Sequence, residues 1–139
     1  MEIRQITSDY AVSPQIAPED FPAIAEAGFT TVICNRPDAE NPPELQGAAM
    51  IPAAEAAGVN FVYNPVVHGG MDRSNLEEQM QAAAEGKTLA YCASGTRSSV
   101  VWALAKAPEM PADDILEATG RAGYALEGLR PQLEALSRR

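Results

Sequence analysis

Short β-branched apolar runs alternate with helical segments through most of this chain, and no other feature limits its fold as strongly. Strands are predicted at Phe29–Cys34, Val59–Tyr63 and Lys87–Tyr91, and helices at Pro18–Ala27, within Glu44–Ala57, from the capping box Ser74-x-x-Glu77 to Gly86, and at Ser98–Ala107, Asp113–Thr119 and Leu129–Leu136. Strands that alternate with helices are joined by right-handed crossovers into a mostly parallel sheet. The pattern therefore predicts an α/β fold.

The composition is that of one globular domain, and it excludes several classes of partner. With 139 residues, of which 46% are hydrophobic and 21% charged, the chain is expected to form a single domain over residues 1–139. Its net charge of −9 opposes binding to nucleic acid or to an anionic membrane, because both need a basic face. A small anionic substrate in a local pocket is compatible with that charge, since salt screens charges beyond about 10 Å.

The sequence contains no pattern typical of targeting or metal binding. No apolar run is long enough to cross a bilayer and residues 1–5 lack the start of a signal peptide, so we expect a cytoplasmic protein. Two cysteines, Cys34 and Cys92, and one histidine, His68, are too few for a disulfide framework or a zinc site. Cys34 is expected to be a small buried hydrophobe; the alternative is a protective disulfide with Cys92 after oxidation. No oligomeric state is predicted, because nothing resembles a dedicated interface.

In a parallel sheet of this kind, binding sites lie at the carboxyl ends of the strands. Three loops follow predicted strands and are expected to meet there: Asn35–Pro43, Asn64–Asp72 and Cys92–Arg97. The third loop is the most informative, because a cysteine leaves a buried strand and an arginine opens a helix shortly after it.

This third loop contains the residue types that thiolate catalysis on an anion needs. Backbone N–H groups in the turn, and the free donors of the helix that follows, should favour an anion and the thiolate form of Cys92. Gly95 allows a backbone conformation that a side chain forbids, and Arg97 can clamp two oxygens of a tetrahedral anion. The alternative is a buried cysteine at a strand end, followed by an ordinary turn. The residues expected to bind the anion with Arg97 are Ala93, Ser94, Gly95 and Thr96.

Three side chains near this loop each allow two interpretations. Ser98 and Ser99 can hydrogen-bond the thiolate or satisfy the start of the helix. Arg36 follows a strand and can add a second positive group to the anion site. Its alternative is a surface ion pair with Asp38 or Glu40.

Several stretches of the sequence also match a known bacterial family. They are Val12–Ile16, Pro18–Asp20, Ala27–Phe29, Thr31–Ile33, Asn35–Asp38, Ala53–Gly58 and Ala90-Tyr91-Cys92-x-Ser94-Gly95-Thr96-Arg97-Ser98. On these residues the chain resembles the beta-lactamase-hydrolase-like phosphatase-like family, a relative of the dual-specificity protein phosphatases. The resemblance implies a three-layer phosphatase-like fold, whose mostly parallel central sheet has about four or five strands flanked by helices. It also implies Cys92 as the nucleophile and Arg97 as the anion clamp.

The loop departs from the phosphatase pattern in its length. Cysteine phosphatases separate the cysteine from the arginine by five residues and usually place a histidine before the cysteine, whereas here four residues intervene and Tyr91 precedes Cys92. The shorter interval and the ending Gly95-x-Arg97-Ser98 are similar to the active loop of single-domain rhodaneses, which carry sulfur as a cysteine persulfide. The overall resemblance therefore indicates phosphate chemistry, while the loop length indicates sulfur chemistry.

Phosphoryl transfer to Cys92 needs an acid that protonates the leaving group, and three side chains are candidates. Asp72 lies on the loop after the second predicted strand, with a helix start as its alternative role. Asp38 is the second candidate, and its alternative is a residue that stabilises the turn at Pro37. His68 titrates in the required range, although a lone loop histidine is more often incidental.

Three functions follow from these observations. The first is a cysteine-dependent phosphatase-like hydrolase that forms a cysteinyl-phosphate intermediate on Cys92 and releases phosphate from a phosphomonoester. The second is a rhodanese-type sulfurtransferase that takes sulfur from a donor onto Cys92 and passes it to a thiol. The third is a non-catalytic module that binds anions or senses oxidants. The partner is a small anionic substrate, either a phosphate ester or a sulfur donor, and neither leading mechanism requires a metal or an organic cofactor.

Overall fold

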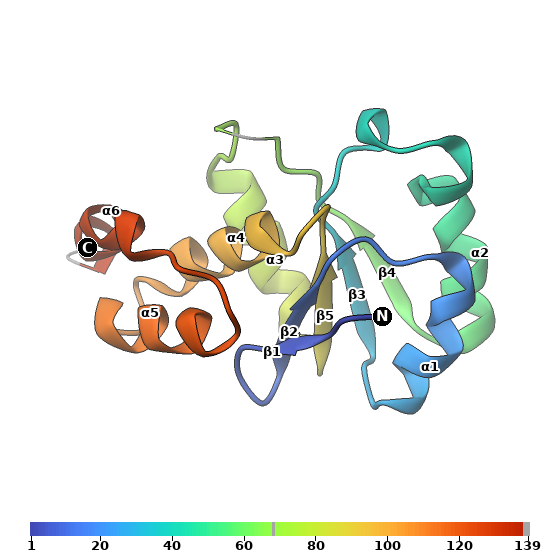
Figure 1. Cartoon of the computed structure of the whole chain (residues 1–139), viewed down its shortest axis with the longest axis horizontal. Coiled ribbons are helices and arrows are strands. Elements are labelled where there is room, and N and C mark those ends of the chain that lie inside the picture. Colours follow the sequence, from blue (N-terminus) through green and yellow to red (C-terminus); the bar gives the residue numbers. More distant parts are fainter. Residues whose placement is uncertain (68, 138–139) are drawn as a thin grey trace.

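A computed structural model describes residues 1–67 and 69–137 of the chain. Five strands form one sheet in the order β1-β2-β5-β3-β4. Their bounds are Arg4–Gln5 (β1), Tyr10–Ser13 (β2), Thr31–Cys34 (β3), Asn60–Tyr63 (β4) and Thr88–Tyr91 (β5). The short edge strand β1 runs antiparallel to β2, whereas β2, β5, β3 and β4 are all parallel. The predicted mostly parallel sheet is therefore confirmed (Figure 1).

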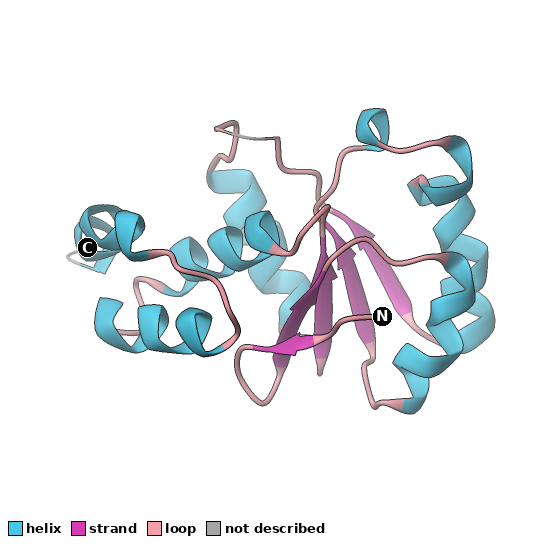
Figure 2. Ribbon diagram, viewed as in Figure 1, coloured by secondary structure: helices cyan, strands magenta, loops and turns pink. Residues whose placement is uncertain are grey.

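Helices cover both faces of the sheet and make three layers (Figure 2). One face carries α1 (Phe21–Glu26) and α2 (Gly47–Ala57). The other carries α3 (Arg73–Ala83), α4 (Thr96–Lys106), α5 (Ala112–Arg121) and α6 (Arg130–Ser137). Four single 3₁₀ turns, at Pro18–Asp20, Asp38–Glu40, Pro43–Leu45 and Glu127–Leu129, complete the connections. The described residues contain no helix that is both long and apolar enough to cross a membrane.

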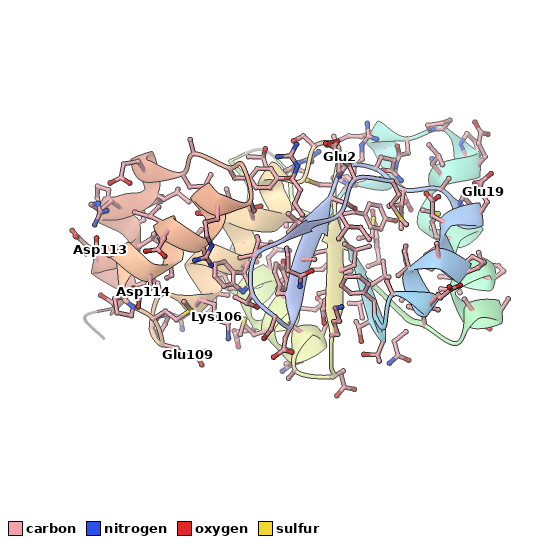
Figure 3. All side chains as sticks on the ribbon, turned by 60° about the horizontal axis from the view of Figure 1, so that its bottom comes forward. Glu2, Glu19, Lys106, Glu109, Asp113 and Asp114 are labelled. Atoms are coloured by element: carbon pink, nitrogen blue, oxygen red, sulfur yellow. The ribbon has the colours of Figure 1, made fainter. Side chains whose placement is uncertain are left out.

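Each face of the sheet has its own apolar core, because successive residues of a strand point to opposite faces. Ile33 and Ala90 belong to the core under α3–α6, and Val32 and Leu89 belong to the core under α1 and α2. Cys34 lies opposite Tyr91 in the register of β3 and β5, and both side chains are part of the second core. Charged side chains such as Glu19, Asp113 and Asp114 project from the outer helices, away from the sheet (Figure 3).

The element predictions need several corrections. The two-residue edge strand β1 and the buried strand β2 were not predicted. The residues directly before β2 are polar, and no predicted helix precedes it. Helix α4 begins at Thr96 rather than at Ser98, since Gly95 takes the left-handed conformation that starts it. Helix α3 is capped by Asp72 and not by Ser74, and the reciprocal partner of Asp72 is Asn75.

Candidate active site

The three predicted loops meet at the carboxyl edge of the sheet, as expected. Asn35 directly follows β3, and its backbone N–H donates to the Tyr91 carbonyl of β5 at 2.8 Å. Its own carbonyl accepts from the Val66 N–H of the loop after β4 at 2.9 Å. The Val66 carbonyl in turn accepts from the Arg97 guanidinium at 2.9 Å. Backbone hydrogen bonds therefore join the loops after β3, β4 and β5 into one unit around Arg97.

Cys92 lies at the end of β5 and points into the turn that begins α4. Its Sγ accepts a hydrogen bond from the Gly95 N–H at 3.1 Å, and the residue has no solvent exposure. Gly95 has a φ of 96°, and any Cβ there would collide with the hydroxyl of Tyr124. That hydroxyl donates to the Ser94 carbonyl at 3.1 Å, so Tyr124 supports the turn from outside. A residue without a side chain is thus required at position 95.

The remaining residues of the turn make contacts of their own. The Thr96 N–H donates to Ser94 Oγ at 3.3 Å, and Ser94 Oγ in turn donates to Thr96 Oγ1 at 3.0 Å. The Ala93 carbonyl accepts from the Gln15 N–H at 3.4 Å. Among the four residues predicted to bind the anion, Gly95 donates its backbone N–H to the Cys92 sulfur. Binding of an anion by these four residues stays a prediction.

The Arg97 guanidinium is buried and holds a carboxylate. Its Nη1 donates to Glu40 Oε2 at 2.9 Å and its Nη2 donates to Glu40 Oε1 at 2.7 Å, while the residue is only 6% exposed. This contact raises the pKa of Arg97, and the Cys92 sulfur adds to the same direction. The hydrogen bond from Arg97 lowers the pKa of Glu40 below its ordinary value. Arg97 therefore donates two parallel hydrogen bonds to one carboxylate, the bidentate geometry that an anion clamp needs, and that carboxylate belongs to Glu40.

The turn from Cys92 to Arg97, which is expected to bind an anion, is not open to solvent in this structure. Cys92 is closed off from solvent, and Arg97 is engaged by Glu40. The physical reason is that a buried guanidinium needs acceptors for its donors, and Glu40 lies within reach on a neighbouring loop. The Glu40 side chain itself is 32% exposed, so the carboxylate enters the clamp from the solvent side.

Arg36 binds the same carboxylate from the other direction. Its Nε lies 3.4 Å from Glu40 Oε1, its Nη2 donates to the Glu40 carbonyl at 3.2 Å, and its Nη1 donates to Gln15 Oε1 at 3.3 Å. The ion-pair interpretation of Arg36 is confirmed, with Glu40 as the partner. Because Glu40 also holds Arg97, the two arginines flank one carboxylate, and both lie at the candidate site.

The two aspartate candidates have structural contacts. Asp72 Oδ1 accepts from the Asn75 N–H at 3.1 Å and from Ser74 Oγ at 2.6 Å, which are the contacts of a helix N-cap on an exposed residue. Asp38 Oδ1 accepts from the Gly47 N–H at 2.9 Å and ties the loop after β3 to the start of α2. The helix-start interpretation of Asp72 is confirmed, whereas the Asp38 carboxylate holds the start of α2, a contact that the sequence did not predict. The acid role of each aspartate stays a prediction. His68 lies outside the described residues.

Ser98 does not contact the thiol, and Cys34 is the small buried residue that the sequence predicts. Ser98 Oγ donates to Asn35 Oδ1 at 2.9 Å and bonds neither the thiol nor the helix start. Ser99 Oγ donates at 2.8 Å to the Gly95 carbonyl, which also accepts the Ser99 N–H, so it bonds neither the thiol nor the free N–H groups at that start. Cys34 and Cys92 are both free thiols. Burial raises the pKa of the Cys34 thiol, as expected for a small buried hydrophobe. Strand alternation places Cys34 and Cys92 on opposite faces of the sheet.

Sequence reasoning missed three residues of the site. Glu40 was considered only as a surface partner of Arg36, although its position four residues after that arginine on a carboxyl-end loop was a usable signal. Asn35 and Gln79 are fully buried polar residues whose contacts come from three separate segments. No local pattern in the sequence indicates those contacts. Among residues 1–67 and 69–137, no group of three His, Cys, Asp or Glu side chains could hold a metal ion.

Comparisons with known proteins find relatives over most of the chain. Residues 2–109 match the family model described as "Beta-lactamase hydrolase-like protein, phosphatase-like domain". The chain is 32% identical over 126 residues to a beta-lactamase hydrolase-like protein of Xylella fastidiosa (strain Temecula1), and the alignment covers 88% of this chain but only 29% of that relative. The chain therefore spans less than a third of the length of this curated relative.

Solved structures support the fold over the whole length. A crystal structure of a "putative phosphatase" from Neisseria meningitidis Z2491 superposes with a TM-score of 0.83 at 34% identity, covering 98% of this chain and 99% of that one. The structure of Tk-PTP in the active form superposes with a TM-score of 0.75 at 21% identity, covering 99% and 97% of the two chains. The predicted phosphatase-like three-layer fold is confirmed.

Proposed function

Because the chain belongs to the beta-lactamase hydrolase-like protein phosphatase-like domain family, we propose that it hydrolyses phosphomonoesters through Cys92. One observation carries the proposal: the Arg97 fork grips two oxygens of one anionic group, with the amide-bound sulfur of Cys92 beside it. A carboxylate and a phosphate both offer a guanidinium two oxygens at matching spacing. Glu40 therefore marks the place where a substrate's oxygens would bind.

The proposed reaction has two steps. In the first, the Cys92 thiolate attacks phosphorus, the bond from phosphorus to the ester oxygen breaks, and the leaving oxygen departs with the bonding electrons and takes a proton from water. In the second, water attacks the cysteinyl phosphate, the sulfur–phosphorus bond breaks, and phosphate and the thiolate are released. Arg97 holds two non-bridging oxygens through both steps, where it stabilises the charge that develops on them. The Gly95 N–H stabilises the sulfur as an anion.

Substrate binding in this scheme requires Glu40 to leave the clamp. A phosphomonoester dianion carries more charge than a carboxylate and can replace both of its hydrogen bonds to Arg97. Glu40 is partly exposed and lies on a 3₁₀ turn at Asp38–Glu40, so it can turn to solvent without unfolding a helix or a strand. Arg36 then offers the displaced carboxylate an alternative partner.

The second candidate is sulfur transfer, and the short interval between Cys92 and Arg97 favours it. In that reaction the thiolate attacks the outer sulfur of thiosulfate, the sulfur–sulfur bond breaks, and sulfite leaves with the bonding electrons. The persulfide on Cys92 then gives its outer sulfur to a thiol or to cyanide. Because sulfite is a good leaving group, this reaction needs no general acid.

The experiment that tests the proposal compares the two substrates on one protein. The protein is incubated with para-nitrophenyl phosphate and, separately, with thiosulfate and cyanide, while intact mass and turnover are measured. Release of phosphate that is lost in Cys92→Ser supports the proposal. A one-sulfur adduct that cyanide discharges, without phosphate release, replaces it with sulfur transfer. Neither reaction, together with ready oxidation of Cys92, indicates a non-catalytic module.

A further inference from the structure

A cluster of buried polar side chains lies directly beneath the candidate site. Gln79 of α3 has no exposure, and its side-chain amide makes four hydrogen bonds. Its Nε2 donates to the Tyr10 hydroxyl at 2.9 Å and to Asn35 Oδ1 at 3.0 Å, while its Oε1 accepts from Asn35 Nδ2 and Asn64 Nδ2, both at 2.8 Å. An amide has two donors and two acceptor sites, so the capacity of Gln79 is fully used.

Asn35 is satisfied to the same degree. Its Nδ2 donates to Gln79 and to the Asn64 carbonyl at 2.9 Å, and its Oδ1 accepts from Gln79 and from Ser98 Oγ at 2.9 Å. Asn35 and Gln79 therefore form a reciprocal amide pair with no free group. Networks that are satisfied in this way fix one arrangement of their members, because any displacement leaves a buried polar group unpaired.

This network reaches the clamp arginine from two sides. On one side, Ser98 follows Arg97 in the chain and is held at both ends, by Asn35 on its hydroxyl and by the Tyr10 hydroxyl on its carbonyl at 3.0 Å. On the other side, the Asn35 carbonyl binds the Val66 N–H, and the Val66 carbonyl binds the guanidinium itself. The backbone that carries Arg97 and an acceptor that orients its tip are thus tied to the same amide pair.

We propose that Asn35 and Gln79 are positioning residues, which hold the Arg97 guanidinium in the direction that grips a substrate anion. The proposal rests on the proposed function for its catalytic consequence. Tyr10 and Ser98 transmit the constraint, and the Tyr10 ring is itself held by stacking on Trp102 with centroids 5.8 Å apart. These hydrogen bonds fix the direction of the first turn of α4, which apolar contacts alone do not specify. A small error in the placement of a clamp is costly to catalysis.

The test uses a matched pair of variants at one position. Ser98→Thr keeps the hydroxyl. Ser98→Val has the same shape as the threonine variant but carries a methyl group in place of the hydroxyl. Tyr10→Phe removes the second link and keeps the stacked ring. Thr119→Val is the control, since Thr119 is a buried hydroxyl in α5 whose Oγ1 bonds only to carbonyls of its own helix.

Two readouts separate this proposal from the proposed function. With para-nitrophenyl phosphate, Ser98→Val and Tyr10→Phe should lower kcat/KM by about tenfold to a hundredfold and raise the inhibition constant of inorganic phosphate, while Ser98→Thr stays closer to the parent protein. In the resting protein, the Nη–H resonances of Arg97 should be resolved, because its guanidinium is held by three acceptors. They should broaden in the same two variants and not in Thr119→Val.

The outcomes are distinguishable. If the parent protein releases no phosphate, the proposed function fails, and the Arg97 resonances still decide the positioning role. If the folded Ser98→Val and Tyr10→Phe proteins match the control in phosphate inhibition and in those resonances, the positioning proposal is overturned. Equal losses in Ser98→Thr and Ser98→Val would also overturn it, since the added methyl group and not the lost hydrogen bond would then be responsible.

Discussion

Replacing Glu40 by glutamine tests whether this carboxylate competes with the substrate. Glu40→Gln keeps the length of the side chain and removes the charge that Arg97 now holds through contacts of 2.9 and 2.7 Å. A substrate anion must displace those contacts before it binds, so the variant should bind inorganic phosphate more tightly than the parent protein. The free energy of unfolding should fall at the same time, because the buried guanidinium loses its charged partner.

The size of the effect follows from the exposure of the pair. A hydrogen bond to a charged group contributes about 1.5–3 kcal/mol when it is shielded from water, and an exposed ion pair contributes about 0–1 kcal/mol. Arg97 is buried and the Glu40 side chain is 32% exposed, so we expect their contact to contribute an intermediate free energy of about 1.4 kcal/mol. That free energy corresponds to about a tenfold change in the affinity for phosphate. The expected result is a roughly tenfold lower inhibition constant for inorganic phosphate.

The assay is competitive inhibition of para-nitrophenyl phosphate hydrolysis, supported by direct titration of phosphate into the Cys92→Ser protein. Glu44→Gln is the matched control, because it removes the same charge from an exposed residue of the same loop. If Glu40→Gln and Glu44→Gln tighten phosphate binding equally, the gain is a general charge effect. Weaker phosphate binding in Glu40→Gln would contradict the competition, and would mean that Glu40 holds Arg97 in place for the substrate.

Three further predictions follow from the same contacts. Arg97 lowers the pKa of Glu40 in the folded protein, so the ion pair stabilises the fold at pH values above 4.5, the ordinary pKa of a glutamate. This stabilisation is lost as the pH falls through the lower pKa of the folded protein. On acidification, the free energy of unfolding should therefore fall more in the parent protein than in Glu40→Gln. Gly95→Ala should cost about 1–3 kcal/mol of stability and abolish phosphate release, because φ is 96° there and the new methyl group meets Tyr124; chemical unfolding and turnover would show it, and an active, equally stable variant would refute it. After peroxide treatment, peptide mapping should find no bond between Cys34 and Cys92, since they lie on opposite faces of the sheet, and a cross-linked peptide would contradict that placement.

Long-range contacts explain most of what was missed. The alternation of β-branched runs with helices predicted three of the four parallel strands, because a glycine separates each of those strands from the helix before it. The strand at Tyr10–Ser13 has no such context, and it is a strand because it pairs with Thr88–Tyr91, far away in the sequence. Local signals also misplaced the cap of α3, since Asp72 and Ser74 are both good capping residues and only the observed geometry distinguishes them.

The sequence by itself determined the α/β class and the meeting of three loops at one edge of the sheet, and it pointed to Cys92 and Arg97 as the candidate nucleophile and anion clamp. These follow from periodicity and from residues close together in the chain, whose chemistry is local. Only the tertiary structure decided what Arg97 binds: Glu40 reaches it from the loop after β3, and Val66 reaches it from the loop after β4. Those partners lie 57 and 31 residues away, so their contacts depend on the register of the strands and on side-chain direction, which no local pattern encodes.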